Sequence, residues 1–153
     1  MSMNALLFGS GGALGRAIYH NLLEEDFLVF TAGSGPRHNT SKHIELSYEQ
    51  PSQPSLFADL PCLDAVIWAQ GLNCSDSILD FQLENLNKLL QSNVVFIAST
   101  QKALLDSGKL AKGSRLCVVS SIFQLETRAG KLSYSISKAA LQGFVKSCAL
   151  DLG

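Results

Sequence analysis

The sequence predicts an α/β fold in which a doubly wound parallel sheet is covered by helices on both faces. Two observations predict it: apolar runs of strand length alternate with helical patterns, and a glycine-rich turn follows the first apolar run. Strands and helices in alternation are joined by right-handed crossovers, which make the strands parallel. The 153 residues contain no internal repeat, low-complexity tract or linker, so we expect a single domain over residues 1–153.

Local patterns predict the individual elements. Short apolar runs between turn residues predict strands at Ala5–Phe8, Phe27–Thr31, Ile44–Leu46, Ala65–Ala69 and Leu116–Val119. Helical spacing of apolar residues predicts helices at Leu14–Glu24, Pro54–Leu60 and Leu83–Leu105, and a last helix from about Ser133 onward. On the first helix, Leu14, Ile18 and Leu22 form one apolar stripe. The polar stretch from Gly33 to His43 is the clearest loop.

Composition excludes several classes of protein. The chain has 12 basic and 13 acidic residues and no basic cluster, which argues against nucleic acid as a partner. Its first residues lack the pattern of a signal peptide, and no apolar run approaches the ~20 residues needed to span a bilayer. We therefore expect a cytoplasmic protein without a membrane partner. The four cysteines and three histidines lack metal-ligand spacing, so we expect free thiols, histidines on the surface or on a helix face, and no metal.

Tyr134 and Lys138 are the most informative pair of residues. They stand four positions apart in a segment with helical apolar spacing, so they share one face of a helix. A phenol has a pKa of roughly 10, and a nearby ammonium group favours the phenolate and lowers that pKa. The pair is therefore a candidate acid/base, although Tyr and Lys one turn apart also occur on many solvated helices.

Further residues accompany this pair at a suggestive spacing. Ser121 lies just past an apolar run that is typical of a buried strand, and Asn93 lies upstream in the predicted long helix. Together with the glycine turn, these residues resemble the short-chain dehydrogenase/reductase family, which carries an Asn, Ser, Tyr-x-x-x-Lys tetrad. The resemblance covers essentially the whole chain. Within the family, the chain is similar to 3-oxoacyl-acyl-carrier-protein reductase-like members. The resemblance implies a Rossmann-type sheet.

The resemblance also implies a mechanism, the transfer of hydride between a nicotinamide and a small carbonyl or alcohol substrate. Tyr134 would protonate the carbonyl oxygen, or remove the alcohol proton in reverse. Lys138 would lower the phenol pKa and hold the nicotinamide ribose. Ser121 would donate to the reacting oxygen, and Asn93 would hold a water that relays protons. Each residue also has an alternative role without catalysis. In that interpretation Ser121 forms a turn at the end of a strand, Asn93 is a polar group on a helix face, and Lys138 is a surface charge.

The glycine turn has a physical role in this hypothesis. Its glycines let the backbone approach a pyrophosphate, and the following helix points its N-terminal amides at the phosphates. A glycine turn used only for packing is the alternative. Relative to the family pattern Thr-Gly-x-x-x-Gly-x-Gly, this chain has Phe8 for the Thr and Ala13 for the middle Gly. The cofactor contacts expected here are Gly9, Ser10, Gly11, Gly12, Leu14 and Gly15.

The end of the second strand predicts which cofactor is preferred. Folds that bind NAD place an Asp or Glu roughly 20 residues after the glycines, where it binds the ribose 2′-hydroxyl. No acidic residue occurs between Asp26 and Glu45. Ser34 can hydrogen-bond a 2′-phosphate and Arg37 can pair with it bidentately, so the sequence favours NADP(H) over NAD(H). The alternative is that Arg37 is a solvated loop cation.

The remaining cofactor contacts come from the resemblance. Glu45 and Leu46 match the family position near the adenine, as does Asp64. The segment Trp68-Ala69-Gln70-Gly71 stands where the family carries Asn-Asn-Ala-Gly, and only its glycine is kept. Ala69 and Gly71 therefore join Tyr134 and Lys138 as expected cofactor contacts, whereas a Trp in a strand run is typical of a core residue.

Two hypotheses about function remain open. The first is an NADP(H)-dependent oxidoreductase, and the second is a non-catalytic dinucleotide-binding or interaction module. The chain stops at Gly153, where family members continue, so we expect a fragment that lacks the last two strands of the family and exposes a sheet edge at Leu116–Val119. Family members commonly pair the Leu83–Leu105 and Tyr134 helices across a two-fold axis, so we expect a homodimer or homotetramer in the complete form.

Overall fold

The computed structural model describes residues 2–34, 42–50 and 52–153. They form two compact units, which we call the sheet unit and the helical unit. The sheet unit comprises Met1–Gln70 and Ser99–Val119, and the helical unit comprises Gly71–Ala98 and Ser120–Gly153.

The sheet unit contains a five-stranded sheet with the strand order β3-β2-β1-β4-β5. The strands are β1 (Asn4–Phe8), β2 (Leu28–Ala32), β3 (His43–Ile44), β4 (Leu63–Trp68) and β5 (Leu110–Val118), and every neighbouring pair is parallel. Strands β2 and β3 follow β1 on one side of the sheet, and β4 and β5 follow on its other side. The strand order therefore reverses between β1 and β4. The doubly wound parallel sheet is therefore confirmed.

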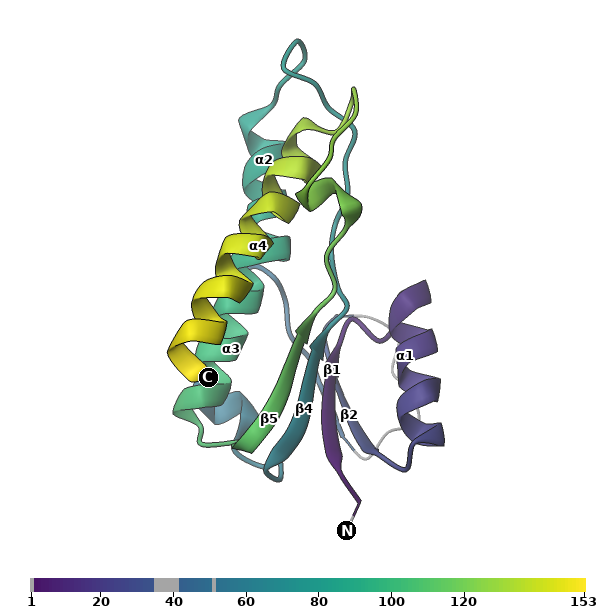
Figure 1. Ribbon diagram of the computed structural model, residues 1–153, viewed down its shortest axis with the longest axis vertical. Helices are drawn as coiled ribbons and strands as arrows, with labels where there is room; N and C mark the ends of the chain where they lie inside the picture. The colour runs from purple at the N-terminus through teal and green to yellow at the C-terminus, as the bar shows by residue number, and fades with distance from the viewer. Residues whose placement is uncertain (1, 35–41, 51) are drawn as a thin grey trace. The chain divides into compact units, whose positions relative to one another are not determined.

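Helix α1 (Ala13–Glu24) packs against one face of this sheet (Figure 1). Its Tyr19 is buried, and Ile18 and Leu22 pack on the same cluster, which includes Ala5, Leu7, Val29 and Ile67 from the strands. Leu14 departs from the predicted apolar stripe, because it lies in the first turn of α1, next to the glycine turn, and is 62% exposed. The sheet contact of α1 is therefore made by its later turns.

The other face of the sheet is built around Trp68. Its ring stacks on Phe8 with centroids 5.5 Å apart, and Phe57 of the 3-10 helix η1 (Pro54–Phe57) meets Phe8 edge-on. The indole Nε1 donates to Thr100 Oγ1 at 2.9 Å. Thr100 belongs to the part of α3 (Phe96–Asp106) that lies in the sheet unit. Trp68 is fully buried, so its predicted core role is confirmed.

Strand β5 differs from its prediction in length and in burial. It begins six residues earlier than the apolar run, and in the described part of the chain it pairs only with β4. The expected exposed edge is therefore present. Cys117 is exposed, which makes the expectation of a buried strand wrong at this position, because no element among the described residues covers that side chain.

His43 lies in β3 and is half-buried, so its predicted surface or helix-face role is wrong. Its Nε2 lies 3.0 Å from the carbonyl oxygen of Gly33, which can only accept, so Nε2 carries the proton. Its Nδ1 lies within hydrogen-bond distance of Thr31 Oγ1, at 2.7 Å. These two bonds fix the chain where β2 ends. Strand β3 itself is displaced toward the N-terminus relative to the predicted Ile44–Leu46.

The helical unit consists of helices and short turns. The predicted Leu83–Leu105 helix is interrupted: α2 (Leu83–Leu90) is followed by a π-helical turn, η2 (Gln91–Val95), before α3 begins. A 3-10 helix, η3 (Ile122–Gln124), precedes α4 (Leu132–Leu152). Within the described residues, no helix combines the length and apolarity that crossing a membrane requires.

Candidate active site

All four residues of the predicted tetrad lie in the helical unit, where the fold brings them together. Tyr134 and Lys138 share one face of α4, with the Lys138 ammonium 5.7 Å from the centroid of the tyrosine ring. Asn93 and Lys138 meet beside Gly71. A Cβ built on Gly71 would lie 3.4 Å from both Asn93 Oδ1 and Lys138 Nζ.

The carboxamide of Asn93 is completely buried in the π-helical turn and is bonded on every side. Its Nδ2 donates to the Leu72 carbonyl at 2.9 Å and to Ser137 Oγ at 3.0 Å. Its Oδ1 accepts from Leu72 N and from Ser92 Oγ. Asn93 therefore ties the segment after Gly71 to α4 and is not a helix-face polar group. Its predicted place within a regular helix is wrong.

Lys138 is 4% exposed, which rules out a surface charge. Burial lowers the pKa of its ammonium group below the ordinary value of a lysine, because a low-dielectric surrounding disfavours the charged form. Ser137, the residue before it, donates from Oγ to the Tyr134 carbonyl and accepts from Asn93. The first turns of α4 are thereby fixed relative to Asn93.

Ser121 begins η3, where its Oγ accepts a hydrogen bond from Phe123 N at 3.3 Å. Ser121 therefore does form a turn, at the start of η3. Because the hydroxyl acts as an acceptor in this bond, its proton can be donated elsewhere. The Phe123 ring meets the Tyr134 ring edge-on, with centroids 5.6 Å apart. Ser121 and Tyr134 are therefore connected through a single intervening residue.

Two charged residues that sequence reasoning missed hold the start of α4. Lys131 is 8% exposed, and its ammonium donates to Asn73 Oδ1, to the Cys74 carbonyl and to Ser75 Oγ, at 2.9 to 3.2 Å. The same ammonium lies 5.7 Å from the Tyr134 ring centroid. The tyrosine ring is thus within cation–π distance of two lysines.

Asp76 is the second missed residue. It is 3% exposed; its Oδ1 accepts from Ser133 N at 3.0 Å and its Oδ2 accepts from the Ser133 hydroxyl. Burial and the nearby Asp76 carboxylate raise the pKa of the Cys74 thiol. No local signal in the sequence predicts the contact between Asp76 and Ser133, because the two residues are 57 positions apart.

The glycine turn lies in the sheet unit and is shaped by its own packing. Gly9 has φ +77°, and a Cβ there would lie 2.6 Å from Gln70 N. A Cβ on Gly15 would lie 2.0 Å from the Gly9 carbonyl oxygen. At Gly12 the nearest atom would be 3.7 Å away. Gly9 and Gly15 are therefore required by close packing, whereas the backbone at Gly12 has room beside it.

The start of α1 suits an anion. Gly12 occupies the N-cap position without a side-chain hydrogen bond, and the first turn holds no acidic residue. The cap residue therefore leaves the first backbone N–H groups of the helix without a side-chain cap, and the positive dipole end faces no acid of its own first turn. Among the other predicted contacts of the turn, Ser10 is buried, Leu14 is exposed, and the Gly11 carbonyl accepts from Arg16 Nη1 at 3.1 Å.

Two of the remaining predicted cofactor contacts, Ser34 and Ala69, follow the carboxyl ends of strands. Ser34 is exposed and follows β2, and the amide N–H of Ala69, directly after β4, donates to the Phe8 carbonyl at 3.0 Å. Arg37 lies outside the described residues.

Asp64 is placed differently from its prediction. Its Oδ2 accepts from Asn4 N at 2.7 Å, at the amino ends of β1 and β4, so it is not a residue of the adenine end.

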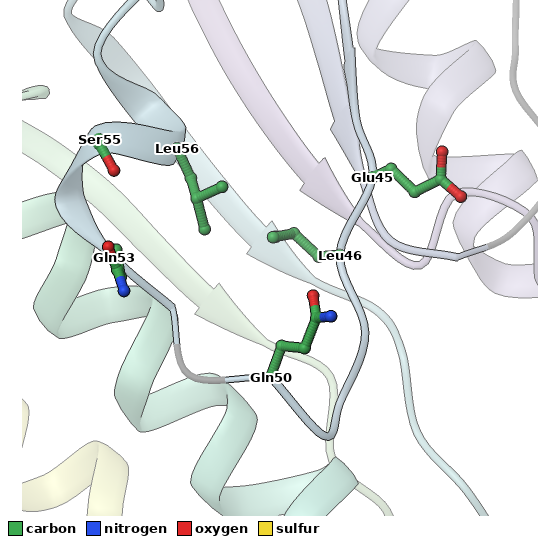
Figure 2. A pocket seen from close by; sticks show the side chains of 6 residues that line it. All are labelled: Glu45, Leu46, Gln50, Gln53, Ser55 and Leu56. Carbon is green, nitrogen blue, oxygen red and sulfur yellow. The ribbon is translucent and has the colours of Figure 1, made fainter.

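Glu45 and Leu46 border an open hollow of about 290 Å³. Figure 2 shows the six side chains that line it, which come from the segment after β3 and from η1: Glu45, Leu46, Gln50, Gln53, Ser55 and Leu56. Leu46 is buried and Glu45 is exposed. Within the described part of the chain, no group of three or more His, Cys, Asp or Glu side chains could hold a metal ion.

Parts of the chain are similar in sequence to known proteins. The family model described as short chain dehydrogenase matches residues 52–153. A cyclopentanol dehydrogenase of Comamonas sp. is 28% identical over 98 residues, which cover 64% of this chain and 39% of the relative. Carbonyl reductase family member 4 of Danio rerio is 25% identical over 170 residues, covering 99% of this chain and 70% of the relative.

Solved structures share the fold. A short chain dehydrogenase family protein from Francisella tularensis superposes with a TM-score of 0.87 at 23% identity, covering 99% of this chain and 64% of that chain. A 3-oxoacyl (acyl-carrier-protein) reductase from Agrobacterium tumefaciens, with NADP bound, gives a TM-score of 0.85 at 18% identity, covering 98% and 64%. This chain thus spans less than two thirds of the length of the cyclopentanol dehydrogenase and of both structures.

Proposed function

Because the chain belongs to the short chain dehydrogenase family, a family of oxidoreductases, we propose that it reduces or oxidises a small carbonyl or alcohol substrate with NADP(H). The observation that carries this proposal is the environment of Tyr134. A buried ammonium, Lys138, lies 5.7 Å from its ring, and Asn93 is bonded to Ser137 between the two. This arrangement fits a tyrosine that gives and takes a proton.

In the direction of reduction, Tyr134 donates its phenolic proton to the carbonyl oxygen and becomes a phenolate. A nicotinamide held by these residues would supply the hydride for the carbonyl carbon. The Lys138 ammonium stabilises the negative charge that develops on Tyr134, and the Ser121 hydroxyl donates to the substrate oxygen. Oxidation of an alcohol runs the same proton transfer backwards.

Several features of the sheet unit support a dinucleotide cofactor. The uncapped start of α1 and the room beside Gly12 suit a pyrophosphate. The absence of an acidic residue between Asp26 and Glu45, together with Ser34 and Arg37, supports NADP(H) rather than NAD(H). The hollow beside Glu45 and Leu46 is a candidate place for the adenine. In the helical unit, Gly71 lies against Lys138, the proposed ribose contact.

A second candidate function is a dinucleotide-binding module without turnover. It is favoured by Trp68, which is a core residue at a position where the family pattern has Asn. The two functions differ in one observable: the module binds NADP(H) but converts no substrate.

The test is to change Tyr134 to Phe, which removes the hydroxyl and keeps the ring. We expect turnover of aldehydes and ketones with NADPH to fall by a factor of about 100 or more, with NADPH binding unchanged. Tyr19→Phe on α1 makes the same chemical change at a tyrosine that is not part of the tetrad and should retain turnover. Equal rates for the Tyr134→Phe variant and the unchanged chain would refute the proposed role of Tyr134.

A further inference from the structure

Gln70, the last residue of the sheet unit, has a buried carboxamide without a partner among the described residues. The residue is 7% exposed, and neither Oε1 nor Nε2 has a hydrogen-bond partner among the residues that the structure describes. A carboxamide carries two N–H donors and an oxygen that accepts two bonds. Leaving these groups buried and unpaired is unfavourable, so native proteins rarely do so without a reason.

Asn93 shows how this chain treats a carboxamide with a structural role. It is more deeply buried than Gln70, yet its amide and its oxygen each make two hydrogen bonds to the protein. The two residues carry the same functional group, which is fully hydrogen-bonded in Asn93 and has no partner among the described residues in Gln70. Within the described part of the chain, the unpaired state of Gln70 is therefore a property of its site, and it suggests a bound ligand as the partner.

The site of Gln70 is the glycine turn. A Cβ built on Gly9 would lie 2.6 Å from Gln70 N and 2.8 Å from Gln70 Cβ, so the two residues are in direct contact. The same turn leads into the uncapped start of α1, where backbone N–H groups can receive an anion. The Cα and Cβ atoms of a residue whose amide has no partner among the described residues thus lie beside the segment that suits a pyrophosphate.

We propose that Gln70 is a cofactor-binding residue whose Nε2 donates to a pyrophosphate oxygen of the dinucleotide and whose Oε1 accepts from an adjoining ribose hydroxyl. This inference rests on the proposed use of a dinucleotide. The family pattern Asn-Asn-Ala-Gly has Ala at this position, and an Ala side chain can form neither bond. The contact is therefore a feature of this chain and adds to the glycine turn that it shares with the family.

The test compares Gln70→Met, which keeps the length of the side chain and removes both polar atoms, with the unchanged chain. Two quantities are measured: the free energy of unfolding without ligand, and the affinity for NADPH by fluorescence titration. We expect Gln70→Met to be at least as stable as the unchanged chain, because no protein hydrogen bond is lost. We expect its affinity for NADPH to fall about tenfold, which corresponds to about 1.4 kcal/mol. Gln70→Ala should show the same loss of affinity.

A second ligand locates the contact. ADP-ribose contains the pyrophosphate and both riboses without the nicotinamide, so its affinity should fall by the same factor. Gln142→Met, which removes a carboxamide from α4, is the control and should leave both affinities unchanged. A loss of affinity for NADPH that ADP-ribose does not share would overturn the assignment to the pyrophosphate.

The remaining outcomes separate this inference from the proposed function. If the unchanged chain binds NADPH and both Gln70 variants bind it equally well, the Gln70 assignment is wrong and the proposed function stands. If both variants lose stability without ligand, the carboxamide has a structural partner and the assignment is again wrong. If the unchanged chain binds neither NADPH nor NADH, both the proposed cofactor and the role of Gln70 are refuted.

Discussion

Asp76 holds Ser133, the residue directly before Tyr134, through both carboxylate oxygens: Oδ1 accepts from Ser133 N at 3.0 Å and Oδ2 accepts from the Ser133 hydroxyl. The carboxylate thereby pairs one of the N–H groups that the first turn of a helix leaves unsatisfied. It also places a negative charge at the positive end of the α4 dipole. The aspartate thus acts as a cap from a distant part of the chain and fixes the turn that carries the tyrosine.

Replacing Asp76 by Ala should therefore lower stability and catalysis together. Loss of a helix cap costs about 1 kcal/mol, and the buried Ser133 groups left without a partner add to this loss. We expect a lower free energy of unfolding in urea, and a lower kcat with little change in NADPH affinity. Asp80→Ala removes an exposed carboxylate that bonds Ser77 and should have a smaller effect on both. Unchanged kcat in Asp76→Ala would show that α4 is positioned without this contact.

The burial of Lys138 predicts a stability that depends on pH. Its pKa is below 10.5 in the folded chain, so between that lowered pKa and 10.5 the unfolded chain binds more protons than the folded one. The contribution of Lys138 to stability therefore becomes more favourable as the pH rises through this interval. Lys138→Met lacks this titration. We expect the variant to be more stable than the unchanged chain at neutral pH and to lose that advantage as the pH approaches 10.5.

Urea unfolding of both proteins over this range of pH measures the difference directly. Lys146→Met removes an exposed lysine from the same helix and should give a profile parallel to that of the unchanged chain. Parallel profiles for Lys138→Met and the unchanged chain would contradict the prediction.

Cofactor preference can be tested by charge reversal. We expect the unchanged chain to bind NADPH more tightly than NADH, because Ser34 and Arg37 can bond a 2′-phosphate and no acidic residue occurs between Asp26 and Glu45 in the sequence. Arg37→Asp should remove the preference, since the aspartate repels the phosphate and accepts from the 2′-hydroxyl of NADH. Lys112→Asp makes the same change on exposed β5 and should keep the preference. Tighter binding of NADH by the unchanged chain would refute the argument.

The helical unit predicts a homodimer. On the two helices expected to pair, Leu89, Phe96 and Ile97 are buried, whereas Val145 on α4 is 45% exposed and available to a second copy. We expect light scattering at micromolar concentration to give twice the chain mass of 16.5 kDa. Val145→Asp should shift the protein to the monomer, and Met3→Asp, at an equally exposed apolar residue of the sheet unit, should not. A monomer mass for the unchanged chain would contradict the proposal.

The sequence predicted those features that depend on neighbouring residues. All five strands follow from the sequence, because each is a short apolar run between turn residues, and their parallel direction follows from the alternation with helices. Tyr134 and Lys138 were placed on one face because a helix brings residues four positions apart together. In both cases a local pattern determines the geometry.

Features that depend on distant contacts were missed. The Asp76–Ser133 and Lys131–Asn73 bonds join residues 57 and 58 positions apart, and nothing in the local sequence marks either partner. His43 was misplaced because its two hydrogen bonds exist only once β2 and β3 are aligned. Asp64 was assigned to the adenine although it bonds Asn4 at the amino ends of the strands. In each case tertiary structure supplies the partner.

The π-helical turn at Gln91–Val95 determines how an insertion or deletion in this region would change which residues face the interior. Its hydrogen bonds run from residue i to i+5, so it contains one residue more than α-helical bonding would. Each residue advances an α-helix by about 100°, and the helical phase therefore shifts across the turn. Removing one residue would restore a continuous α-helix, but Leu89 and Asn93 could then no longer both face the interior. A sequence alignment that closes this extra position would thus pair Asn93 with residues of the wrong helical face.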